Sequence, residues 1–132
     1  MIENLIKRKV DELIYEWGTR EPIRLCKYLG IRIKYGDYGS IKGAFRVILD
    51  KKCIFINDNL EENEKKIILS HELGHAILHS NESIQELLMF EHMVKSGKLE
   101  NEANLFAIYL LKEEYSHENI KIALERLANW SY

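Results

Sequence analysis

The sequence predicts an α+β fold in which about five to six helices pack with a small antiparallel sheet. Two observations carry this prediction. Apolar residues recur every three or four positions near both ends of the chain, as on one face of a helix, whereas they alternate with polar residues from Ile31 to Tyr35, as in a strand. The length of 132 residues fits one compact domain over residues 1–132.

The first third of the chain predicts two helices. Helical spacing of apolar residues continues from Ile2 to Trp17, and Gly18 follows as a stop signal. Pro22 suits the first position of a second, shorter helix, because the N–H that proline lacks has no partner there. This helix is expected to end at Gly30.

A hairpin is predicted after the strand that begins at Ile31. The segments Phe45 to Leu49 and Cys53 to Asn57 are rich in β-branched and aromatic residues, and three polar residues separate them. The exposed edge of this hairpin, around Cys53 to Asn57, is expected to hold an extended substrate strand through main-chain hydrogen bonds.

Helices are predicted for the rest of the chain. Asp58 or Asn59 is the expected N-cap of a helix that runs to Leu78, with glutamates in its first turn. The three further helices are expected over Ile84 to Ser96, Glu100 to Glu113, and Glu118 to Trp130.

Charge and cysteine content exclude several classes of protein. The 19 basic and 21 acidic side chains give a net charge of -2, without the basic excess of a direct nucleic-acid binder. The longest apolar run, Leu105 to Leu111, is far shorter than the ~20 residues that cross a bilayer, and the N-terminus lacks a signal-peptide pattern. We therefore expect a cytoplasmic protein, in which the isolated Cys26 and Cys53 are buried free thiols.

The sequence His71-Glu72-Leu73-Gly74-His75 has the H-E-x-x-H pattern and lies inside a predicted helix. Residues four apart share one face of a helix, so both imidazoles can reach one Zn²⁺ ion. Glu72 lies beside that position and can act as the general base toward the water that attacks a substrate. Gly74 costs helix stability, which suggests that another element packs closely against this helix.

A catalytic zinc ion needs a third protein ligand, and the sequence leaves several candidates open. His79 follows on the same helix, but three ligands in a row along one helix lie too far apart to converge, so we interpret it as a helix-end histidine. Glu102 has the better helical context, because it lies at the flank of an apolar stripe on the helix predicted over Glu100 to Glu113. Glu100 and His92 are the alternatives, and Glu91 and His117 are weaker ones.

The stretches IILSHELGHAILH, from Ile67 to His79, and ENEANLFAIYLL, from Glu100, resemble the ImmA/IrrE family of small zinc metallopeptidases. The resemblance extends from about residue 10 to residue 115. It implies a zincin-like fold, zinc ligands at His71, His75 and Glu102, and a catalytic glutamate at Glu72. The chain continues with Lys112 and Glu113 where typical members have Met-Pro, which leaves the end of that helix in question.

The resemblance also implies a partner. Many members of the family are encoded beside a helix-turn-helix repressor on phages or other mobile elements, and they act as antirepressors by cleaving it. We therefore expect a zinc endopeptidase. Two alternatives stay open: a non-catalytic antirepressor that binds its partner with the same scaffold, and a hydrolase that acts on a non-peptide amide.

Overall fold

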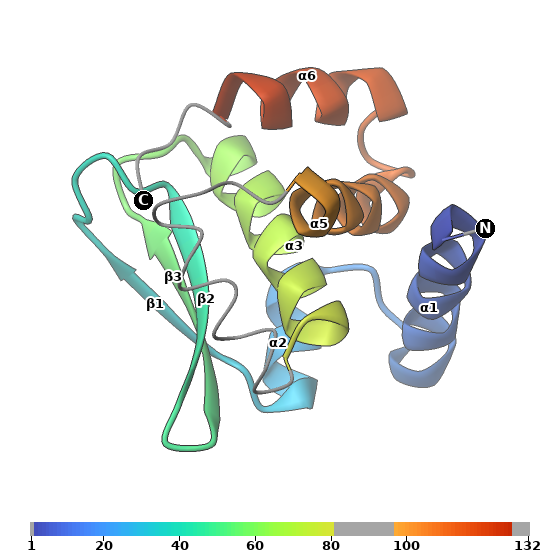
Figure 1. The fold of residues 1–132 in the computed structure, drawn as a ribbon, viewed down its shortest axis with the longest axis horizontal. Helices are drawn as coiled ribbons and strands as arrows, with labels where there is room; N and C mark the ends of the chain where they lie inside the picture. The colour runs from blue at the N-terminus through green and yellow to red at the C-terminus, as the bar shows by residue number, and fades with distance from the viewer. Residues whose placement is uncertain (1, 81–96, 128–132) are drawn as a thin grey trace.

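The computed structural model describes residues 2–80 and 97–127, in which five helices pack with a three-stranded sheet that lies at one side of the molecule (Figure 1). The helices and strands, in chain order, are α1 (Ile2–Trp17), α2 (Pro22–Leu29), β1 (Arg32–Gly36), β2 (Gly43–Ile48), β3 (Lys51–Asn57), α3 (Glu62–Leu78), α5 (Gly97–Leu111) and α6 (His117–Leu127). The predicted α+β class is confirmed. The helix predicted over Ile84 to Ser96 and the end of the last predicted helix lie outside the described residues.

The hairpin predicted from sequence is formed by β2 and β3, which pair antiparallel with Phe45 opposite Ile54. Its turn places both Leu49 and Asp50 in the left-handed region, at φ 51° and 63°. Positive φ at both central residues is the geometry of a primed turn, whose twist matches that of the flanking strands.

The sheet differs from the antiparallel expectation in one respect, because β1 runs parallel to β3. The strand order is β1-β3-β2, so the segment between β1 and β2 must pass over the end of β3. The Asn57 side chain holds this segment by donating from Nδ2 to the carbonyls of Gly39 and Ile41, each at 2.9 Å. The parallel pairing therefore depends on a contact between residues far apart in sequence.

The same strand order shows that the prediction of an exposed substrate-binding edge around Cys53 to Asn57 is wrong. The segment Cys53 to Asn57 lies in β3, the central strand, whose backbone pairs with β1 on one side and β2 on the other. No substrate strand can add there, because the main-chain groups already bond within the sheet.

Helix α3 runs between the sheet and α5, and α1 packs on the other side of α5 (Figure 1). From Ile67 to Ala76 every residue of α3 is buried, which is why its apolar pattern covers more than one face. The main core joins all of these layers, with Phe45, Ile54, Leu73 and Phe106 among its most buried side chains.

The start of α3 differs from the prediction. Its N-cap is Glu61, which forms a capping box with Glu64, and neither Asp58 nor Asn59 caps the helix. Those two residues belong to the turn after β3, where the Asn59 N–H donates to the Asn57 side chain at 2.9 Å.

The predicted state of the cysteines is confirmed, since Cys26 and Cys53 are both free and buried. Among the described residues, no helix combines the length and apolar character needed to cross a membrane.

Candidate metal centre

Two histidines of α3 and one glutamate of α5 converge at the contact between these helices. His71 and His75 lie one helical turn apart, with ring centroids 4.9 Å from each other, and each side chain is almost fully buried. Glu100 Oε2 lies 2.8 Å from His75 Nε2 and 3.4 Å from His71 Nε2. Two imidazole nitrogens and one carboxylate oxygen therefore lie within 4.8 Å of one another.

This donor set fits a divalent metal ion. In a tetrahedral zinc site with bonds of about 2.1 Å, the ligand atoms lie roughly 3.4 Å apart, and the distances of 2.8 Å and 3.4 Å from Glu100 Oε2 to the two histidines are of this order. Three protein ligands also leave a fourth position open, as catalytic sites require.

The structure brings Glu100, and not the predicted Glu102, to the two histidines. The two glutamates differ by about 200° around the axis of α5, because each residue turns a helix by 100°. Glu100 shares a face with Ala103 and Asn104, the face that α5 turns toward α3. The Glu102 carboxylate instead lies 2.8 Å from Nε2 of His79.

Close packing at Gly74 sets the distance between the helices. A Cβ atom at this position would lie 3.0 Å from Phe106 Cβ and 3.2 Å from both Cα and O of Ala103. The close approach that the sequence indicated is confirmed. Glycine at position 74 therefore lets α5 come near enough for Glu100 to reach the histidines of α3.

Each histidine of the pair also bonds through its second ring nitrogen. His71 Nδ1 lies 2.8 Å from Asn104 Oδ1, and His75 Nδ1 lies 2.9 Å from Nδ1 of His79. Such contacts fix the orientation and tautomer of metal-binding histidines. The role of Asn104 was not predicted from sequence, although its position four residues after Glu100 places both on one helix face.

Glu72 is almost completely buried, on the side of α3 that packs against the start of β2. A side chain at Gly43 of β2 would overlap Ile68 and would come within 3.4 Å of Glu72 Cγ. Burial raises the pKa of Glu72 to about 7, the positive charge of His71 acts against this rise, and the negative charge of Glu100 adds to it. The carboxylate predicted as the general base thus lies next to His71 in a desolvated position.

The pKa values of the three candidate ligands shift in directions set by their surroundings. Burial lowers the pKa of His75 to about 4, which keeps this imidazole neutral at pH 7. Burial acts to raise the pKa of Glu100, but its bonds to His71 and His75 outweigh it and hold that pKa far below the usual range. For His71, burial lowers the pKa while Glu100 and Glu72 raise it, and the net shift is upward.

Two of the other candidates from sequence, His79 and His117, do not join this group. His79 is the C-cap of α3, as expected for a helix-end histidine, and bonds to His75 and Glu102. His117 is exposed at the start of α6. Glu91 and His92 lie outside the described residues.

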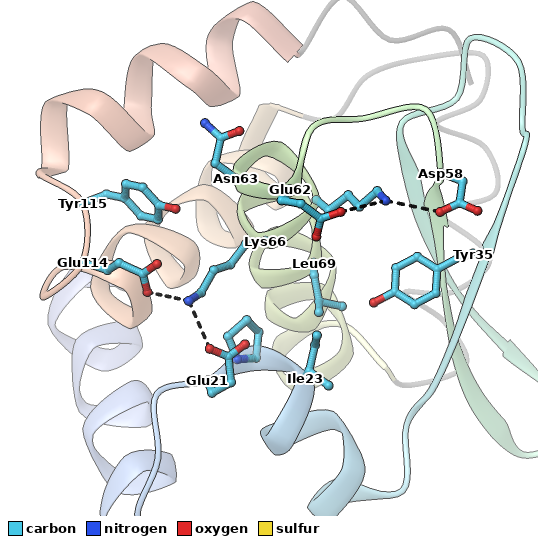
Figure 2. Close-up of a pocket in the computed structure, with 12 residues that line it drawn as sticks. Glu21, Ile23, Tyr35, Asp58, Glu62, Asn63, Lys66, Leu69, Glu114 and Tyr115 are labelled. Carbon is cyan, nitrogen blue, oxygen red and sulfur yellow. Dashed lines mark hydrogen bonds and ion pairs between the residues drawn. The ribbon is translucent and has the colours of Figure 1, made fainter.

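A cavity of about 630 Å³ lies apart from these residues, between the first half of α3, the start of α2, β1 and the turn after α5 (Figure 2). Its two lysines are each held between two carboxylates. Lys66 lies 3.0 Å from Glu21 and also contacts Glu114, and Lys65 lies 3.3 Å from both Asp58 and Glu62. None of His71, His75 and Glu100 lines this cavity.

Comparison with known proteins assigns the chain to a family. A family model described as the IrrE N-terminal-like domain, a peptidase family, matches residues 26–119. "Uncharacterized immunity region protein 2" of Bacillus phage phi105 is 35% identical over 129 residues, which cover 94% of this chain and 80% of that protein. "Metallopeptidase ImmA" of Bacillus subtilis (strain 168) is 32% identical over 108 residues, which cover 80% of this chain and 62% of that protein. The chain therefore belongs to the ImmA/IrrE family of metallopeptidases, as its motifs, fold and histidine-glutamate cluster together indicate.

Proposed function

We propose that the chain is a single metallopeptidase domain over residues 1–132 and a zinc-dependent endopeptidase. The convergence of His71, His75 and Glu100, with Glu72 buried beside them, is the observation that carries this proposal. Two imidazole nitrogens and one carboxylate oxygen suit zinc better than magnesium or calcium, which prefer ligand sets made of oxygen atoms.

His71 and His75 would hold the zinc ion through Nε2, and Glu100 would hold it through its carboxylate. When bound there, the ion would supply Lewis-acid activation of water and of the scissile carbonyl. Glu100 would also offset part of the positive charge in a site where solvent is largely excluded.

Glu72 has the role of general base. Its carboxylate takes a proton from the attacking water and then delivers that proton to the nitrogen of the leaving amine. Its place in the helix, one residue after His71, directs it to the edge of the metal group, and packing against the start of β2 limits its movement. Helix α3 thus carries both histidines of the metal group and the proton carrier.

The substrate that we propose is a helix-turn-helix repressor of a phage or other mobile element, which makes the chain a cytoplasmic antirepressor. Two relatives support this choice: one is named as a phage immunity region protein and the other as a metallopeptidase. Resemblance to a family whose members cut such repressors supports it further.

The test compares the wild type with Glu72→Gln against the repressor encoded beside the gene. We expect the variant to retain zinc and to lose cleavage, because glutamine keeps the shape of the side chain but cannot accept the proton. Glu62→Gln is the control, since it removes a highly exposed carboxylate from the same helix. Relief of repression by Glu72→Gln at the wild-type level, without cleavage, would contradict the enzyme and would support the non-catalytic antirepressor.

A further inference from the structure

Three side chains form a continuous hydrogen-bonded chain behind the candidate metal centre. His75 Nδ1 lies 2.9 Å from His79 Nδ1, and His79 Nε2 lies 2.8 Å from Glu102 Oε1. Both histidines are almost fully buried, and the Glu102 side chain is 13% exposed. These hydrogen bonds therefore connect the C-terminal end of α3 to α5 through side chains that are largely shielded from solvent.

The direction of the hydrogen bonds follows from the chemistry of each group. In the metal-bound state His75 Nε2 cannot also donate to Glu100, because this nitrogen must offer its lone pair to the cation. The ring proton of His75 is then on Nδ1 and is donated to His79 Nδ1. His79 in turn carries its own proton on Nε2 and donates it to Glu102, whose carboxylate oxygen accepts.

We propose that His79 and Glu102 are positioning residues that hold His75 in the tautomer with the proton on Nδ1, and so keep Nε2 available to the metal ion. This inference rests on the proposed zinc site. The Glu102 carboxylate is the last acceptor in this series of hydrogen bonds. It gives the series a single direction and makes His75 a stronger metal ligand. The reverse direction would place a proton on Nε2 of His75 and would exclude a cation.

Glu102 thus receives a role different from the one predicted from sequence. It contacts His79 and acts on the metal centre through two histidines in series. A positioning role differs in its consequences from a purely structural link between α3 and α5. A structural link would affect folding stability, whereas a positioning role must affect metal affinity in variants that fold.

The first test measures the zinc affinity of folded variants by competition with a chromophoric chelator. His79→Leu and Glu102→Leu should each bind zinc about 10- to 100-fold more weakly, the usual effect of losing such a supporting partner. His79→Asn should recover part of the affinity, because its amide oxygen can accept from His75 Nδ1 as the imidazole does. Circular dichroism verifies that each variant is folded.

Glu64→Leu is the matched control, because it makes the same substitution at another partly buried carboxylate. Its side chain is 17% exposed, close to the value for Glu102, and it bonds to Arg126 instead of a histidine. This variant should lose stability without a change in zinc affinity. Unchanged affinity in folded His79→Leu and Glu102→Leu would overturn the inference, and so would equal losses in the control.

A second measurement needs no variant. The two-bond ¹H–¹⁵N spectrum of zinc-loaded protein with ¹⁵N-labelled histidine reports which nitrogen of each ring carries the proton. We expect His75 protonated on Nδ1 and His79 on Nε2, and the opposite assignment for His79 would overturn the inference. A wild type that binds no zinc would refute the proposed site together with the inference, whereas normal zinc binding with any of the contrary results would refute the inference alone.

Discussion

Glu100 of α5 and His75 of α3 meet with 2.8 Å between Oε2 and Nε2, although 25 residues separate them in sequence. This contact depends on how closely the two helices pack, because Glu100 lies about one turn before Ala103, whose backbone lies against Gly74. Packing and metal binding are therefore coupled, and variants at the helix contact should change both.

Gly74→Ala should lower both the stability of the fold and its affinity for zinc. Alanine favours a helix by about 1 kcal/mol over glycine, but overpacking a core costs about 1–3 kcal/mol. Here the new methyl group would press on the backbone of Ala103, which cannot move aside as a side chain can. Thermal unfolding and chelator competition measure the two effects.

Gly97→Ala provides the control for this variant, since a Cβ at that position would meet nothing within 4 Å. It should leave zinc affinity unchanged. Wild-type zinc affinity in Gly74→Ala would show that Glu100 does not depend on the close approach of α5.

Removal of the metal should destabilise the protein. A ligand that binds only the folded state at 100 times its dissociation constant adds about 2.7 kcal/mol to the free energy of unfolding. Without it, the negative charge of Glu100 and the buried Glu72 lose the cation that offsets them. The melting temperature should fall after EDTA treatment and recover when zinc is restored, and an unchanged value would count against the site.

Cys26 should make stability fall at alkaline pH. Burial raises the pKa of its thiol from 9.0 to about 12, so the unfolded chain loses this proton at lower pH than the folded protein does. The stability that the protonated thiol contributes is complete below about pH 9 and is lost as pH rises toward 12, by up to about 1.4 kcal/mol per pH unit.

Denaturant unfolding of the wild type and Cys26→Ala across this range isolates the contribution of Cys26. The free energy of unfolding of the wild type should fall more steeply with pH than that of the variant. Parallel curves would show that the Cys26 thiol is not buried as the structure has it.

Elements with uninterrupted local patterns were predictable from sequence. The helical spacing from Ile2 to Trp17 matches the bounds of α1. The helix ends there because Gly18 adopts the left-handed conformation, at φ 69°. Local patterns could not give the parallel pairing of β1, since that depends on the Asn57 side chain and the distant loop that it holds. The single-domain boundary over residues 1–132 stays a prediction.

In the candidate site too, the residues of one local motif were predictable and the contacts between helices were not. His71, Glu72 and His75 follow from one motif within one helix, so their mutual placement was predictable. The choice between Glu100 and Glu102 depends on which face α5 turns toward α3, and Gly74 and Ala103 determine that face by their contact. The chain of His75, His79 and Glu102 could not be predicted for the same reason, because it joins two helices.

Zinc content per chain, measured side by side for the wild type, Glu100→Gln and Glu102→Gln, tests the central claim most directly. We predict about one zinc ion per wild-type chain, as in other three-ligand catalytic sites. Glu100→Gln should retain little or no zinc after dialysis, whereas Glu102→Gln should still bind zinc, with weaker affinity. A wild type without zinc, or a Glu100→Gln variant that retains it as firmly as the wild type, would contradict the account.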